Sequence, residues 1–215
     1  LAPIRDPDAV FLHLFTGGST GRPRSWSKTA RNLFGEAFFL AATLGIGEGD
    51  VLLSTAPPQH IYGLLCSVLV PFAAPARVLP ETCLFPQEIL SGLETAGVTI
   101  LVGIPIHYRA LRTADLSRHS LRLALSSAGA VDAGDGAFFR ERTGLPVTEI
   151  FGSTETGGIA LRTDQTAAGV CEPFTVVDWK VASGRLAVRS PFLSPDLPRD
   201  GYGYFLTSDR VAPSG

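Results

Sequence analysis

The chain has 215 residues, a formal net charge of -2 at pH 7, 45% hydrophobic residues and a mean hydropathy of +0.23. A charge this close to zero argues against a nucleic acid as partner, because binding a phosphate polymer requires an excess of Lys and Arg. The longest apolar run, residues 61–70, is too short to span a bilayer and is stopped by Pro71, so we expect no membrane span.

Apolar runs of strand length alternate with helical patterns over most of the chain. We expect strands at residues 10–15, 51–54, 77–79, 99–102, 122–125 and 147–150, and helices at residues 30–44, 61–72, 86–96, 105–113 and 133–143. The high hydrophobic content suits strands buried on both faces. This order predicts an α/β fold with a doubly wound parallel sheet.

The pattern changes near residue 165. No helical pattern follows, and residues 174–181, 184–189 and 202–207 are typical of short antiparallel strands separated by turns. We therefore expect an α/β part over residues 1–165 and a partial, small antiparallel β subdomain over residues 166–215.

The cysteine and lysine usage indicates a compartment and a source. Cys66, Cys83 and Cys171 are odd in number and lack CxxC spacing, which favours reduced thiols in a cytoplasmic protein. Lysine occurs only at Lys28 and Lys180 against many arginines, as GC-rich bacterial coding would give.

A loop rich in glycine and hydroxyl residues follows the first expected strand. Glycine lets backbone N–H groups approach a ligand closely, and hydroxyl and basic side chains donate to phosphate oxygens. The loop contains Thr16, Gly17, Gly18, Ser19, Thr20, Gly21, Arg22 and Arg24. Its order fits neither the Walker nor the Rossmann pattern. A phosphate site is one interpretation, and a plain surface turn is the other.

The same loop also matches G-x-S-x-G, the pattern around a serine hydrolase nucleophile. That mechanism needs Ser19 on a tight strand-to-helix turn, with an acid and a histidine later in the chain. Residues 22–25 delay the helix, and no histidine follows His119. A serine hydrolase is therefore the less favoured alternative.

A second candidate loop follows the strand expected at residues 147–150. It contains Phe151, Gly152, Ser153, Thr154 and Glu155. Because loops at the carboxyl ends of parallel strands converge on one crevice, we expect both loops to face one ligand. Thr154 can donate to a phosphate, and Glu155 can bind Mg²⁺, which favours one or two carboxylates together with phosphate oxygens. A helix-capping or solvated glutamate is the alternative.

Further candidates lie near other expected strand ends. Gly129 and Ala130 are small enough to wall a pocket for a flat ring, or to allow close helix packing. Asp209 can accept hydrogen bonds from ribose hydroxyls, or serve as a turn residue. His60 and Tyr62 overhang the same crevice, although a lone histidine is more often structural than catalytic.

Taken together, these segments resemble the adenylate-forming (AMP-binding) superfamily, which includes acyl- and aryl-CoA synthetases. Residues 16–24 resemble its phosphate loop [ST]-[SG]-G-[ST]-T-G-x-P-[KR], residues 57–63 its segment with a gating histidine, and residues 151–155 its aromatic-G-x-T-E motif. Residues 184–191 and 204–209 are similar to G-E-[LI]-x-V-[RK]-[GS]-P and Y-x-T-G-D. Arg24, Phe151 and Ser208 depart from the usual Lys, Tyr and Gly in ways that look compatible with nucleotide binding.

The resemblance implies an ATP-dependent acid–thiol ligase. It would form an acyl-adenylate from an aryl or fatty acid and pass the acyl group to CoA or to the phosphopantetheine of an acyl carrier protein. Its ligands would be ATP or AMP and Mg²⁺. The implied catalytic residues are Thr154, Glu155 as metal ligand, and His60. The nucleotide would contact Thr16 to Gly21, Arg24, Gly129, Ala130, Phe151, Gly152, Ser153 and Asp209, and the acyl group His60, Tyr62, Gly129 and Ala130.

Two parts of the family's pattern have no counterpart in the chain. Family members have a preceding segment and a small C-terminal domain with a catalytic lysine, so we expect a truncated portion of the large domain that is inactive alone. The alternative is a non-catalytic nucleotide- or acyl-binding module. Uncovered apolar surface would in either case favour a homo-oligomer.

Overall fold

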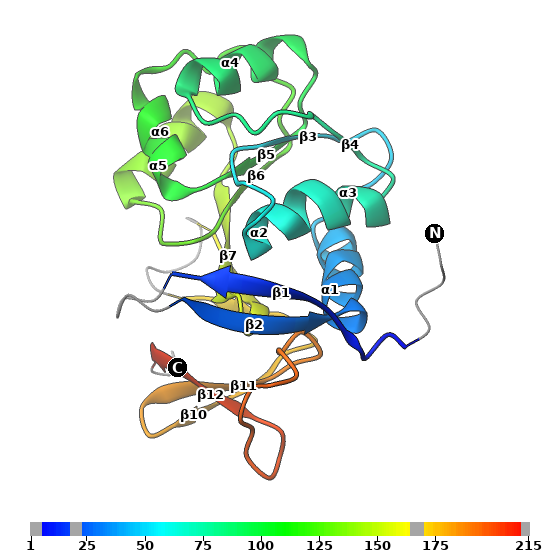
Figure 1. Cartoon of the computed structure of the whole chain (residues 1–215). Coiled ribbons are helices and arrows are strands. Elements are labelled where there is room, and N and C mark those ends of the chain that lie inside the picture. Colours follow the sequence, from blue (N-terminus) through cyan, green and yellow to red (C-terminus); the bar gives the residue numbers. More distant parts are fainter. Residues whose placement is uncertain (1–5, 18–22, 164–169, 212–215) are drawn as a thin grey trace.

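The protein, seen in a computed structural model, is described here over residues 6–17, 23–163 and 170–211. A seven-stranded sheet with the order β4-β3-β5-β6-β7-β8-β9 forms its centre (Figure 1). Five neighbouring strands are parallel: β4 (Arg77–Val78), β3 (Val51–Ser54), β5 (Ile100–Gly103), β6 (Leu123–Ser126) and β7 (Val147–Ser153). The strands β8 (Gly157–Arg162) and β9 (Glu172–Pro173) extend the sheet in antiparallel pairing.

Helices cover both faces of this sheet, as expected for a doubly wound fold. Successive side chains of a strand point to opposite faces, so Leu52 packs with one apolar cluster while Leu53 packs with the other. The first cluster includes α1 (Ala30–Thr43) and the segment α2 (Ile61–Leu64), η1 (Leu65–Leu69) and α3 (Val70–Ala73). The second includes α4 (Pro86–Thr95), α5 (Pro105–Ala110), η2 (Leu111–Thr113) and α6 (Ala133–Thr143).

The first strand does not belong to the parallel sheet, so that expectation was wrong. β1 (Val10–Thr16) pairs antiparallel with β2 (Arg24–Thr29) in a separate two-stranded sheet. The reason lies in burial: Phe11 and Phe15 are 51% and 65% exposed, whereas every residue of β3 and β5 is buried. The sequence pattern also missed β2, and the first candidate loop is the connection of this hairpin.

The helix expected at residues 61–72 contains a π-helical turn, η1, between two α-helical turns. Pro71 has no backbone N–H to donate within the helix, and the Ser67 hydroxyl donates to the Gly63 carbonyl at 2.6 Å. None of the helices in the described ranges is long and apolar enough to cross a membrane, as expected.

A three-stranded antiparallel sheet follows, in the order β10 (Asp178–Ala182), β11 (Arg185–Arg189) and β12 (Phe205–Arg210). Two boundaries differ from expectation, because Phe174 is buried against Phe39 of α1 instead of lying in a strand, and β12 begins after Tyr204. The expected boundary at residue 165 falls within residues 164–169, outside the described ranges, and stays a prediction.

Candidate functional site

A cavity of about 910 Å³ opens between the large sheet and the small sheet. This size lies within the range of small-molecule sites. Gly129, Ala130, Phe151, Gly152 and Asp209, which the sequence assigns to one nucleotide site, all line it. The other lining residues are Ser127, Ala128, Glu149, Ile150, Ile159, Ala160, Arg162, Val170, Cys171, Pro173, Trp179, Leu186, Arg210 and Val211.

The loop after β6 forms a wall of small side chains. Ala128 adopts φ +67° and Gly129 φ +153°, both outside the usual range for L side chains. The loop is held to β7 because the Ser127 hydroxyl donates to the Ile150 carbonyl at 2.9 Å and the Val131 N–H donates to Glu149 Oε2 at 2.8 Å. Residues 128–130 remain exposed, which leaves a thin, open wall suited to a flat ring.

The second candidate loop is shorter than expected, because β7 continues through Ser153. The prediction that Phe151 to Ser153 form a turn is therefore wrong, and the turn is made by Thr154, Glu155 and Thr156. The β7–β8 pairing has an irregularity between Phe151 and Gly152. A Cβ on Gly152 would collide with the Gly157 carbonyl oxygen, so glycine permits the close approach of the two strands here.

The turn itself is built on hydroxyl groups. The Ser153 and Thr156 hydroxyl oxygens lie 2.9 Å apart, and the Ser153 N–H donates to Thr156 Oγ1 at 3.0 Å. Ser153 therefore has a local structural partner. The Glu155 carbonyl accepts the Ser194 N–H at 2.8 Å, whereas the Glu155 carboxylate has no hydrogen bond or ion pair to any described residue. That carboxylate is partly exposed.

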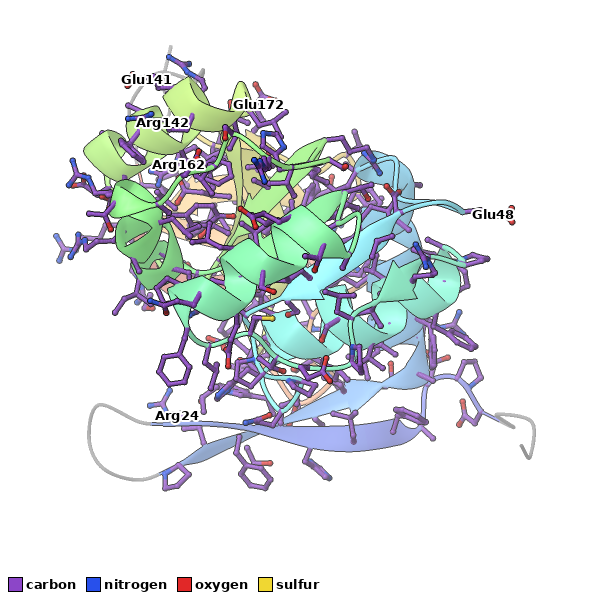
Figure 2. All side chains as sticks on the ribbon, turned by 90° about the horizontal axis from the view of Figure 1, so that it is seen from above. Arg24, Glu48, Glu141, Arg142, Arg162 and Glu172 are labelled. Carbon is purple, nitrogen blue, oxygen red and sulfur yellow. The ribbon has the colours of Figure 1, made fainter. Side chains whose placement is uncertain are left out.

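Of the first loop, the structure describes Thr16, Gly17 and Arg24, whereas Gly18, Ser19, Thr20 and Gly21 lie outside the described residues. Thr16 and Arg24 face each other in the hairpin, and Thr16 Oγ1 accepts the Trp26 Nε1–H at 3.2 Å. Neither lines the cavity. Figure 2 shows Arg24 on the hairpin, well apart from Arg162, which does line it.

The hairpin also bears on the hydrolase alternative. A nucleophile elbow connects a strand to a helix, whereas the segment with Ser19 lies between the paired strands β1 and β2. The structural context of that mechanism is therefore not met.

His60 and Tyr62 lie outside the cavity as well. His60 is exposed at the start of α2. The Tyr62 hydroxyl is buried and has no hydrogen-bond partner among the described residues, and burial raises the pKa of this phenol well above its usual value. Of the residues that the sequence assigns to the acyl group, Gly129 and Ala130 line the cavity, whereas His60 and Tyr62 do not.

Several cavity residues escaped the sequence analysis. Glu149 and Arg162 form an ion pair at 2.8 Å. Cys171 is a free thiol whose pKa is raised by burial. The ion pair depends on the antiparallel pairing of β7 with β8, which the sequence pattern did not predict. No local signal in the sequence therefore indicated it.

The residues present fit a cation shared with phosphate better than a protein-only metal centre. Among the described residues there is no group of three or more His, Cys, Asp or Glu side chains that could hold a metal. Mg²⁺ bound with substrate phosphates needs one or two carboxylates, and Glu155 supplies one with free oxygens.

Comparison with curated proteins finds CoA ligases. The chain is similar to an anthranilate–CoA ligase of Pseudomonas aeruginosa (29% identity, covering 96% of this chain and 42% of that protein). It is also similar to a feruloyl-CoA synthase of an Amycolatopsis species (30% identity, covering 82% and 38%). The chain thus spans less than half the length of these relatives.

Comparison with solved structures finds the same fold. ATP-bound MatB of Rhodopseudomonas palustris matches with a TM-score of 0.84 at 22% identity, covering 94% of this chain and 46% of that one. A malonyl-CoA ligase product complex with methylmalonyl-CoA and AMP matches with a TM-score of 0.81 at 25% identity, covering 94% and 50%.

A family model described as AMP-binding enzyme matches residues 1–192. This match covers most of the chain, agrees with the fold, and includes the segments around Thr16, His60, Gly129 and Glu155. The chain belongs to the AMP-binding enzyme family.

Proposed function

We propose that this protein activates a carboxylic acid with ATP and then transfers the acyl group to the thiol of CoA, with a carrier-protein phosphopantetheine as the alternative acceptor. The observation that carries the proposal is the cavity that Gly129, Phe151 and Asp209 share in a chain of the AMP-binding family. Relatives named as CoA ligases support CoA as the acceptor.

The proposed chemistry has two displacements. First, a carboxylate oxygen of the acid attacks the α-phosphorus of ATP, and the bond to the bridging oxygen breaks so that pyrophosphate leaves. Next, the thiol loses its proton to solvent, its sulfur attacks the acyl carbonyl, and AMP leaves with the electron pair of the broken bond. Positioning and charge neutralisation carry such reactions more than covalent catalysis does.

We assign the nucleotide roles as follows. The wall at Gly129 and Ala130 and the Phe151 side chain flank the base, and the Asp209 carboxylate accepts from the ribose hydroxyls. Thr154 donates to the α-phosphate. The first loop holds the β- and γ-phosphates through Thr16, Gly17, Gly18, Ser19, Thr20, Gly21 and Arg24, while Gly152 and Ser153 shape the turn.

We propose Mg²⁺ as the cation that accompanies the nucleotide. Glu155 is the proposed ligand, since its carboxylate has no other hydrogen-bonding partner in the described part of the chain. When bound, the ion would neutralise charge on the phosphate oxygens.

We propose an aryl acid as substrate, with a fatty acid as the alternative, because two relatives are named for aromatic acids, anthranilate and ferulate. His60 and Tyr62 would border its acyl part. The three free cysteines support a cytoplasmic location. The preference for arginine over lysine supports a bacterial source. The exposed rings of Phe38 and Phe72, on neighbouring helices, support a homo-oligomer.

Residues 1–165 would bind nucleotide and acid, and residues 166–215 would contribute Asp209.

The test is ATP–pyrophosphate exchange by the natural protein that carries this sequence, measured with aryl, hydroxycinnamic and fatty acids. We expect exchange that depends on one of these classes. Nucleotide binding without exchange for any acid would overturn the proposal in favour of a binding module. Covalent labelling of Ser19 by a fluorophosphonate would overturn it in favour of a hydrolase.

A further inference from the structure

Two buried ionisable residues, Lys28 and Glu36, lie next to the turn that carries Glu155, and the function proposed above gives them no role. Lys28 of β2 is 0% exposed and Glu36 of α1 is 2% exposed. Burying ions is costly unless each is paired or hydrogen-bonded, so a buried pair that persists in a fold needs partners. Burial lowers the pKa of Lys28 to about 8 and raises the pKa of Glu36, while the charge of each residue opposes the shift of the other.

The Lys28 side chain binds two backbone carbonyl groups, one of which belongs to the turn. Its Nζ donates to the Phe192 carbonyl at 2.9 Å and, over a longer 3.5 Å, to the Glu155 carbonyl. The Ser194 N–H donates to the same Glu155 carbonyl at 2.8 Å. The cation therefore joins β2, the turn and the segment after β11 at one point.

Glu36 contacts the start of β8, the strand that follows the turn. Its Oε1 accepts the Gly158 N–H at 2.6 Å, and its Oε2 is buried with no partner among the described residues. Gly157 has φ +68°, and a Cβ built there would lie 2.7 Å from Glu36 Oε2. The carboxylate thus packs directly against the backbone that follows Thr156.

We propose that Lys28 and Glu36 are positioning residues for the turn of Thr154, Glu155 and Thr156, and that they fix the direction of the Glu155 carboxylate for a cation. This inference rests on the proposed function, which assigns Glu155 to Mg²⁺. Lys28 binds the Glu155 carbonyl within the turn and Glu36 binds the Gly158 N–H in the strand that follows, so the ligand is oriented before the cation arrives. Groups that orient a metal ligand in this way typically contribute 10- to 100-fold in metal affinity.

A purely structural role for the pair makes a different prediction. It would lower thermal stability without altering the response to Mg²⁺. Asn32 offers a matched control, because its Nδ2 donates to the Pro191 carbonyl at 2.6 Å, so it ties α1 to the same segment without touching the turn.

The experiment is calorimetric titration of ATP into the natural protein, with and without Mg²⁺, alongside thermal unfolding. We expect Lys28→Met and Glu36→Gln to reduce the gain in ATP affinity that Mg²⁺ provides by about 10-fold or more, with little change in ATP affinity without Mg²⁺. Asn32→Ala should lower the melting temperature and keep the full Mg²⁺ effect. Glu36→Gln keeps the size and the Gly158 acceptor, so it serves if Lys28→Met does not fold.

The outcomes separate this inference from the proposed function. If Glu155→Gln removes the Mg²⁺ effect while both Lys28→Met and Glu36→Gln retain it, the positioning role is refuted and the proposed function is untouched. If the wild-type protein binds ATP with a Mg²⁺ effect that these variants lose, but exchanges pyrophosphate with no acid, the positioning role holds and the ligase proposal fails. An absence of any Mg²⁺ effect in the wild type would overturn the inference.

Discussion

Glu149 and Arg162 face each other across the antiparallel pair β7–β8 and form an ion pair of 2.8 Å in the wall of the cavity. The second Glu149 oxygen accepts the Val131 N–H at 2.8 Å. One carboxylate therefore connects strand β8 to the loop that follows β6.

Glu149→Gln should lower the free energy of unfolding by about 1.5–3 kcal/mol, the usual range for hydrogen bonds to a charged group. The partners left behind, Arg162 and the Val131 N–H, are only partly accessible to water. Urea denaturation measures the change. Asp8→Asn, which breaks an exposed ion pair with Arg31, is the control and should have a smaller effect, because solvent screens exposed pairs. Equal effects of the two substitutions would refute the special role of Glu149.

Glu155→Gln should slow acid-dependent pyrophosphate exchange by about 100-fold or more, the loss typical of one electrostatic contact to a transition state. The measured quantity is the exchange rate at saturating acid. Glu172→Gln removes an exposed carboxylate from nearby β9 and should leave the rate unchanged. An unaltered rate in Glu155→Gln would exclude a role in metal binding.

Asp209→Ala should weaken AMP binding by about 10-fold or more, because a carboxylate that accepts from hydroxyls contributes about 1.5–3 kcal/mol. Asp209 lines the cavity, whereas Asp178, in the same small sheet, does not. Calorimetry with AMP should show full affinity for Asp178→Ala. Equal AMP affinities for wild type and Asp209→Ala would remove Asp209 from the site.

Asp50 gives a prediction about acid stability. Two hydrogen bonds from Arg122, at 2.8 and 2.6 Å, are the main reason that the pKa of Asp50 falls from 3.8 to about 2. A depressed folded pKa adds stability that is fully present above the unfolded pKa and is lost as pH falls through the folded pKa. Asp50→Asn should therefore flatten the fall in unfolding free energy between about pH 4 and 2. Parallel acid profiles for the two proteins would contradict this.

Much of the fold could be predicted because a strand buried on both sides has a recognisable sequence pattern, a continuous run of apolar residues. Leu52, Leu53 and Leu101 belong to such runs, and their side chains are buried on both faces of the sheet. The error at residues 10–15 came from the same reasoning, since Phe11 and Phe15 look like core residues but are exposed in a hairpin. β8 was missed because it begins with Gly157 and Gly158, and glycine is more typical of loops than of strands. Its strand conformation depends on the pairing with β7.

The candidate site could also be predicted only in part. Gly129, Phe151 and Asp209 could be predicted as candidates because each stands in a short recognisable segment, and all three line one cavity. The Glu149–Arg162 pair depends on strand register, and the burial of Lys28 and Glu36 depends on packing between distant segments. Neither relationship leaves a local pattern in the sequence.

The central claim is that the cavity between the two sheets holds the adenylate. A crystal structure of the natural protein with bound AMP tests it most directly. We predict the base between the Gly129–Ala130 wall and Phe151, with the ribose hydroxyls within hydrogen-bond distance of Asp209. AMP bound elsewhere, with this cavity filled only by solvent, would contradict it.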